Sequence, residues 1–116
     1  MLIRGPKNVL MEEAESSHGG VGAYRVRTLM TKEFSSALKY IRELRLEPGS
    51  SIGRHPHIGD EEIYYVISGS GTMLVDGETA DIHQGDAVLT KSGSSHGLSN
   101  NSTEELVIFV VCAGYC

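Results

Sequence analysis

Residues of the kind that bind metal ions stand close together in the middle of this sequence. His55 and His57 lie one residue apart, and the carboxylate Glu62 follows shortly after them. In a β-strand residues i and i+2 point to the same face, so both imidazoles are expected to face one cavity. Glu62 opens the next strand, which we expect to return beside the histidines as an antiparallel neighbour and to add an oxygen ligand.

A third imidazole, His96, begins a later strand after the tight turn KSGSS. Three imidazole nitrogens and one carboxylate leave open positions on a six-coordinate first-row metal, where a substrate can bind. The expected cofactor is therefore one divalent transition metal, and Mn, Fe, Ni, Co and Zn all accept this ligand mixture. The alternative is a buried polar network in a barrel that binds no metal.

The segments that must position these residues are predicted to be strands. Glycines recur every few residues after Gly49 and separate short runs rich in Val, Ile, Tyr and Thr, which is typical of an all-β sandwich or barrel. Asp76 and Gly77 predict a tight hairpin turn, because both residue types tolerate positive φ angles. The segment 31–37, TKEFSSA, is the one stretch that suggests a helical turn.

Alternation along the strands sorts the other polar side chains into inward and outward positions. Tyr64 shares the face of Glu62, so we expect it to line the cavity and orient a substrate, whereas the adjacent Glu61 is expected to face solvent. Arg42 shares the face of the apolar Leu44. We expect Arg42 to form an ion pair at the end of the barrel rather than to hold an anionic substrate.

Five further positions carry simpler expectations. His18 lies in the flexible segment SHGGVG and either covers the mouth of the cavity or has no role there. His83 is expected to be exposed, and Asn100 to close the turn after the last ligand strand. Cys112 and Cys116 stand at the extreme C-terminus, where a disulfide would close only a tiny loop, so both are expected to be reduced thiols.

Two spaced motifs run through residues 49–100. The first consists of Gly49, His55, His57, Glu62 and Gly69. The second consists of Gly85, Gly93, His96 and Asn100, with Lys91 where a proline is usual. These spacings resemble the motifs of the cupin family. The resemblance implies an antiparallel jelly-roll β-barrel with the metal inside it, and very often a homodimer.

Small cupins of this kind are often similar to oxalate decarboxylase, and one position tests that likeness. In that enzyme an arginine that binds the substrate carboxylate stands three residues before the first histidine of the motif; here the position is Ile52. The nearest arginine, Arg54, has the parity of an outward residue. The usual decarboxylation mechanism is therefore disfavoured. We expect a pocket with one metal-facing polar side and an apolar wall made by Ile52, Tyr64, Val66 and Met73.

Composition restricts the partners. The net charge of −5 leaves no basic stripe, so neither nucleic acid nor an anionic membrane surface is an expected partner. No segment approaches the roughly 20 apolar residues of a membrane span, and no signal peptide is evident, so a cytoplasmic protein is expected. A small polar molecule is the expected ligand.

The length of 116 residues indicates one domain. We expect residues 1–36 to form an N-terminal strand or arm that packs on the barrel or on a partner subunit, and residues 37–116 to form the barrel. The final run ELVIFVVC is apolar without alternation, so both of its faces should be covered. The core would cover one face, and the N-terminal segment or a second subunit, as in a homodimer, would cover the other.

The favoured function is enzymatic. A metal acting as a Lewis acid on a small carbonyl, enol or carboxylate compound would serve an isomerase, a decarboxylase or a dioxygenase. Glu62 could double as the general base if it detached from the metal. The alternative is a module that binds or senses a small molecule without turnover. A purely structural metal is less consistent, because structural zinc sites are closed and rich in thiolates.

Overall fold

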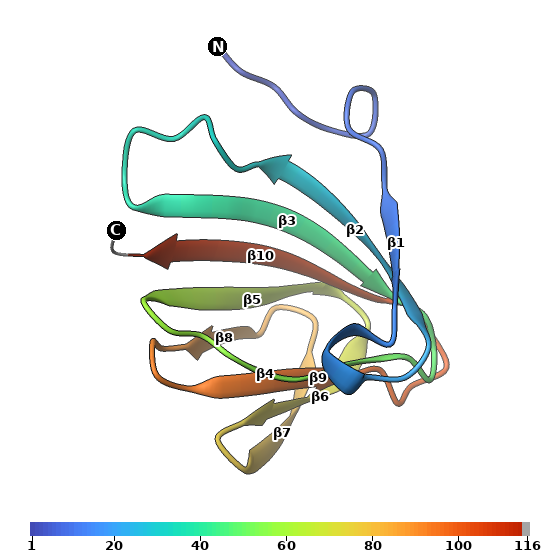
Figure 1. Cartoon of the computed structure of the whole chain (residues 1–116). Helices are drawn as coiled ribbons and strands as arrows, with labels where there is room; N and C mark the ends of the chain where they lie inside the picture. The colour runs from blue at the N-terminus through green and yellow to red at the C-terminus, as the bar shows by residue number, and fades with distance from the viewer. Residues whose placement is uncertain (115–116) are drawn as a thin grey trace.

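The computed structural model describes residues 1–114, which fold almost entirely as antiparallel β-sheet (Figure 1). In chain order the elements are β1 (Glu12–Glu15), the short 3-10 helix η1 (Ser17–Gly19), β2 (Ala23–Met30), β3 (Leu38–Leu46), β4 (Ser51–Pro56), β5 (Asp60–Ser68), β6 (Ser70–Val75), β7 (Glu78–His83), β8 (Ala87–Thr90), β9 (Ser95–Ser99) and β10 (Leu106–Gly114). Within residues 1–114 no helix has the length and apolar character needed to cross a membrane.

The strands form two sheets. The larger has the order β1-β2-β3-β10-β5-β8 and the smaller has the order β4-β9-β6-β7, and Figure 1 shows them as two facing layers. Consecutive strands cross repeatedly from one sheet to the other, which is the arrangement of a jelly-roll barrel. The predicted all-β antiparallel barrel is confirmed.

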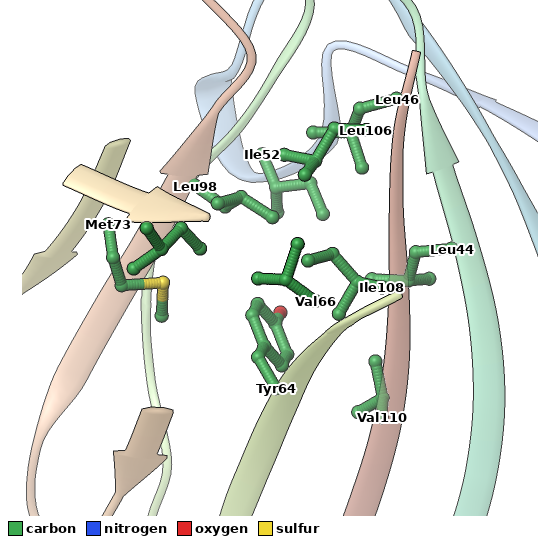
Figure 2. Packing of buried hydrophobic residues seen from close by; sticks show 11 residues of the cluster. Leu44, Leu46, Ile52, Tyr64, Val66, Met73, Leu98, Leu106, Ile108 and Val110 are labelled. Atoms are coloured by element: carbon green, nitrogen blue, oxygen red, sulfur yellow. The ribbon is translucent and has the colours of Figure 1, made fainter. Parts of the chain in front are cut away.

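The core lies between the two layers. Leu44 and Ile108 project inward from the larger sheet, and Met73 and Leu98 from the smaller one (Figure 2). The inward positions of β10 are at most 1% exposed, because that strand lies between β3 and β5 at the centre of its sheet. Burial of these apolar side chains is the main driving force for closing the two layers on one another.

The hairpin between β6 and β7 forms where the sequence predicts it. Asp76 has φ 48° and Gly77 has φ 84°, the positive angles that a two-residue type I′ turn requires. This turn fixes the register of the two strands, in which Val75 pairs with Glu78.

The predicted helical turn over 31–37 is wrong. The segment connects β2 to β3 through bends, and only Phe34 in it is partly buried. The carboxylate of Glu33 accepts hydrogen bonds from the backbone N–H groups of Thr31 and Lys32, which satisfies these donors without a helix. The short helical stretch lies instead at η1, in a segment expected to be flexible.

The outer face of the final strand is only partly covered within residues 1–114, although Val107 on this face is buried. Phe109 and Val111, on the outer face of β10, are only partly buried. The N-terminal strands do not cover this face, because β1 and β2 continue the sheet sideways from β3. Strands β1 and β2 therefore do not provide the cover that the sequence suggested from the N-terminal segment.

Candidate metal centre

Four side chains converge at one end of the barrel interior. Their nitrogen and oxygen atoms all lie within 4.8 Å of one another. Nε2 of His96 is 3.1 Å from Nε2 of both His55 and His57. Oε1 of Glu62 is 3.1 Å from Nε2 of His57 and of His96. We call this group the ligand cluster; its members are His55, His57, Glu62 and His96.

Both sheets contribute to the ligand cluster. His55 on β4 pairs directly with His96 on β9, and His57 follows β4 with its backbone N–H bonded to Ser94. Glu62 comes from β5, which pairs with β10 and β8. The expectation that Glu62 lies on an antiparallel neighbour of the histidine strand is therefore wrong. Gly59, with φ 80°, lies in the short loop that carries the chain to the opposite sheet, so Glu62 reaches the histidines across the barrel.

Hydrogen bonds at Nδ1 fix the orientation of each ring. Nδ1 of His55 lies 2.8 Å from the carbonyl oxygen of Gly53, and Nδ1 of His57 lies 2.8 Å from Oδ1 of Asp60. Because a carbonyl and a carboxylate can only accept, both Nδ1 atoms carry the proton and both Nε2 atoms present a lone pair to the centre.

The third ring is held in a similar way. Nδ1 of His96 lies 2.7 Å from the hydroxyl oxygen of Thr90, and both residues are at most 1% exposed. The ring therefore presents its Nε2 to the same centre. Partners of this kind at the remote ring nitrogen are typical of histidines that bind metal, because they fix the ring and its tautomer.

Glu62 is satisfied at one oxygen only. Its Oε2 accepts a hydrogen bond from the hydroxyl of Tyr40, whereas Oε1 is buried and makes no hydrogen bond. An unpaired buried carboxylate oxygen is costly, and it lies here beside two imidazole lone pairs that repel it. A divalent cation between these atoms would remove both penalties, so the donor set fits a transition metal.

Protonation also favours the forms that bind metal. Burial lowers the pKa of His55, which favours the neutral imidazole. Burial raises the pKa of Glu62, but the hydrogen bond that the Tyr40 hydroxyl donates to its Oε2 acts against burial, and the pKa lies below its ordinary value. The carboxylate is therefore ionised at neutral pH.

A cavity of about 430 Å³ opens from the ligand cluster. Ile52 and Tyr64 line it as predicted, whereas Val66 and Met73 belong to the hydrophobic core and are not lining residues. The remaining wall comes mainly from the larger sheet and its N-terminal strands. It consists of Glu12, His18, Tyr24, Val26, Thr28, Tyr40, Arg42, Leu44 and Val110.

Arg42 faces this cavity instead of forming the predicted ion pair. Within residues 1–114 its guanidinium has no carboxylate partner, and its Nε is buried without a hydrogen bond. The guanidinium carbon lies 3.7 Å above the ring of Tyr40, the residue that bonds Glu62. The outward positions Glu43 and Arg45 of the same strand carry surface ion pairs, and strand alternation turns Arg42 to the opposite, inward face.

The structure also shows where the other residues considered in the sequence analysis lie. Glu61 and His83 are exposed, as predicted. Asn100 is buried and closes the turn through bonds from its side-chain nitrogen to the carbonyls of Leu46 and Glu104. Cys112 is a buried thiol; Cys116 lies outside the described residues.

Sequence reasoning missed three supporting residues. Asp60 and Thr90 bond the remote nitrogens of two ligand rings, and Tyr40 bonds the ligand carboxylate. A signal existed for Asp60, which stands three residues after His57, at the start of the strand that carries Glu62. No local signal existed for Tyr40 or Thr90, because each contact joins different strands.

The family can be assigned from the whole barrel together with its ligand cluster. A family model described as a cupin domain matches residues 42–112, more than half of the chain. The chain belongs to the cupin family. This cupin is 32% identical over 112 residues to an oxalate-binding protein of Thermotoga maritima, with 96% of this chain and 92% of that protein covered.

Solved structures agree with the assignment. The crystal structure of a predicted oxalate decarboxylase from Thermotoga maritima matches this cupin with a TM-score of 0.93 at 30% identity, covering 98% of this chain and 100% of that chain. A Cupin 2 conserved barrel domain protein from Salinispora arenicola has a TM-score of 0.73 at 24% identity, covering 97% of this chain and 88% of that chain, and so shares the fold.

Proposed function

We propose that this cupin binds one divalent transition metal through the ligand cluster and binds a small carboxylate, such as oxalate, at that metal. The main support is that the four ligand atoms lie within 4.8 Å of one another and that one of them, the buried Oε1 of Glu62, makes no hydrogen bond. When bound, the metal supplies a Lewis acid with open coordination positions for ligand oxygens. Mn, Fe, Ni, Co and Zn are all compatible with this ligand set.

Arg42 supports a carboxylate as the ligand. Its guanidinium has no carboxylate partner within residues 1–114 and lines the same cavity as the ligand cluster. A planar guanidinium matches a carboxylate in geometry and charge, and a second carboxylate group of a ligand held at the metal could receive its hydrogen bonds. The similar protein from Thermotoga maritima that is described as oxalate-binding agrees with this choice.

The remaining wall limits what can enter. Ile52 and Leu44 are each 5% exposed and present hydrocarbon to the cavity. They exclude water from one side and favour a compact ligand whose charged groups point toward the cluster and Arg42. We assign Glu62 to the metal alone, since Oε2 already accepts the hydrogen bond from Tyr40 and Oε1 faces the histidines.

Turnover of the carboxylate is the second candidate, and Tyr64 favours it. Its ring lies 4.9 Å from that of His96, between ring centroids, and the residue lines the cavity. Burial, and then the negative charge of Glu62, raises the pKa of Tyr64 well above its usual value, so the hydroxyl stays protonated. Such a hydroxyl can donate a hydrogen bond to an oxygen on which negative charge develops.

The first test is metal content. We expect protein purified without chelator to carry a near-stoichiometric transition metal by elemental analysis, and the Glu62→Ala, His96→Ala double variant to carry almost none. His83→Ala is the matched control, since that imidazole is exposed on β7. A wild-type protein that neither carries nor takes up metal refutes the proposal.

The second test separates binding from turnover. We expect the metal-loaded protein to bind oxalate in calorimetry and Arg42→Met to weaken that binding about tenfold or more, because a charge-assisted pair is lost. Release of carbon dioxide or formate, abolished by Tyr64→Phe while oxalate still binds, would establish the enzymatic candidate. Binding without product would establish the binding module.

A further inference from the structure

A fourth histidine lies beside the ligand cluster without belonging to it. The ring of His18 stacks on that of His55, with centroids 4.1 Å apart and planes 18° from parallel. His18 also lines the cavity that opens from the cluster. Within residues 1–114 its ring nitrogens make no hydrogen bond, so they are available to a molecule in the cavity.

The backbone holds this histidine in place. The segment 16–22, which we call the strap, lies against β4 (Figure 1). Two hydrogen bonds hold it there: the Ser51 N–H donates to the Val21 carbonyl at 2.8 Å, and the Val21 N–H donates to the Ser51 hydroxyl at 2.9 Å. The hydroxyl of Tyr24 adds a bond of 3.1 Å to the Ser17 hydroxyl. The strap is thus anchored on the strand that carries His55.

Two glycines allow this close approach. A Cβ atom on Gly20 would collide with the Ser51 carbonyl, and one on Gly53 would collide with the His18 carbonyl. The strap itself contains two non-glycine residues in the left-handed region, Ser16 at φ 49° and His18 at φ 53°. Non-glycine residues uncommonly adopt this conformation, and those that do gather at ligand-binding sites.

We infer that His18 is a substrate-contacting residue, placed by the strap to hydrogen-bond the carboxylate bound at the metal. The inference rests on the proposed function and adds to it a specificity residue from the N-terminal part of the chain. The stack on His55 fixes the ring plane, and His18 lines the cavity that opens from the ligand cluster. A small carboxylate would then be held from two protein sides, by Arg42 on β3 and by His18 on the strap.

The test compares ligand affinity with metal content. We expect His18→Ala to raise the Kd of Mn-loaded protein for oxalate about tenfold, as the loss of one hydrogen bond to a charged group predicts, with metal content unchanged. His18→Gln, which keeps a hydrogen-bonding group, should recover part of that affinity. His83→Ala is the control. Equal oxalate affinity in the wild type and in His18→Ala overturns the inference. A loss of bound metal in His18→Ala that accounts for its loss of oxalate affinity also overturns it.

A backbone variant tests the strap separately. Gly20→Ala must lift the strap from Ser51, so we expect the same loss of oxalate affinity as in His18→Ala and no further loss when both changes are combined. Gly5→Ala is the matched control, because no atom lies within 4 Å of the added carbon. Fully additive losses would contradict placement of His18 by the strap.

Azide titrated into Co-loaded protein and followed by visible absorption distinguishes the two proposals. If the metal-loaded wild type binds azide but no oxalate, the proposed ligand class is wrong. A weaker azide affinity in His18→Ala than in the wild type would then still support a contact between His18 and the metal-bound ligand, and equal azide affinities would refute that contact. A chain that takes up no metal refutes both proposals.

Discussion

At the scale of single residues, the atoms behind the ligands determine how the ligand cluster can act. His57 is oriented by Asp60, which is bonded in turn to Lys39 at 2.7 Å. Burial raises the pKa of Asp60, but the hydrogen bonds from Lys39 and His57 outweigh burial and leave the pKa below its ordinary value. An ionised carboxylate behind the ring increases the basicity of Nε2, which strengthens a metal bond.

Asp60→Asn should therefore weaken metal binding without unfolding the barrel. An amide oxygen can still accept a hydrogen bond from the Nδ1–H of His57, but it lacks the negative charge, and changes of this kind cost about 10- to 100-fold in metal affinity. Competition with a chelating dye measures the affinity. Asp81→Asn, exposed on β7, is the control, and Lys39→Met separates the effect of the ion pair. Unchanged affinity in Asp60→Asn would show that the carboxylate does not act through His57.

At the scale of elements, β3 serves two different surfaces. Its inward positions carry Tyr40 and Arg42 to the cavity, and its outward position Glu43 bonds Arg27 at 3.0 Å and Arg45 at 2.6 Å. The pair with Arg27 joins β3 to β2, the strand that provides part of the cavity wall, whereas Arg45 lies on β3 itself. Partial burial raises the pKa of Glu43, but the hydrogen bonds from Arg27 and Arg45 outweigh it and hold the pKa below the ordinary 4.5.

Glu43→Gln should lower the free energy of unfolding by about 1 kcal/mol at neutral pH, as expected for a partly exposed pair of ion contacts. A carboxyl group whose pKa is lower in the folded state stabilises the fold at pH values above its unfolded-state pKa. This contribution is lost as the pH falls through the lowered, folded-state pKa. The difference between variant and wild type should therefore fade below pH 4.5. Urea unfolding across this pH range measures it, with the exposed Glu78→Gln as control. A difference that persisted in acid would point to packing rather than charge.

At the scale of the whole molecule, the part of the larger sheet formed by β10, β5 and β8 presents an apolar outer face. Ile63, Tyr65, Ile67 and Leu89 are 39 to 47% exposed there. Ile63 pairs with both Leu89 and Val111, and Tyr65 pairs with Phe109, so these side chains form one continuous surface, the outer patch. Large continuous apolar surfaces on soluble proteins mark contacts with partners.

We expect two copies of the chain to pair through the outer patch, because one self-complementary surface suffices for a two-fold dimer. Ile63→Glu places a charge near the centre of the patch and should convert the dimer to a monomer in sedimentation equilibrium. Leu10→Glu, at a side chain 84% exposed in the N-terminal segment, should leave the assembly unchanged. A wild-type monomer at high concentration would contradict this expectation.

Local patterns were sufficient for much of the fold and for the identity of the ligand cluster. The i, i+2 spacing of His55 and His57 fixes their common direction, because strand side chains alternate between faces. The same parity correctly turns Tyr64 inward and Glu61 outward. The hairpin turn at Asp76 was also predictable, since its geometry depends on the backbone preferences of two adjacent residues.

Only the tertiary structure decided which residues meet. Parity assigns a side chain to a face but does not say which strand lies opposite, so the approach of Glu62 from the other sheet and the open guanidinium of Arg42 could not be read locally. His18 and His55 are separated by 36 residues in the sequence. Their rings meet because the strap packs on β4, where two glycines allow the backbones to approach closely. The sequence by itself thus determined the type of the site, through short-range geometry, while long-range strand pairing and loop packing determined its walls.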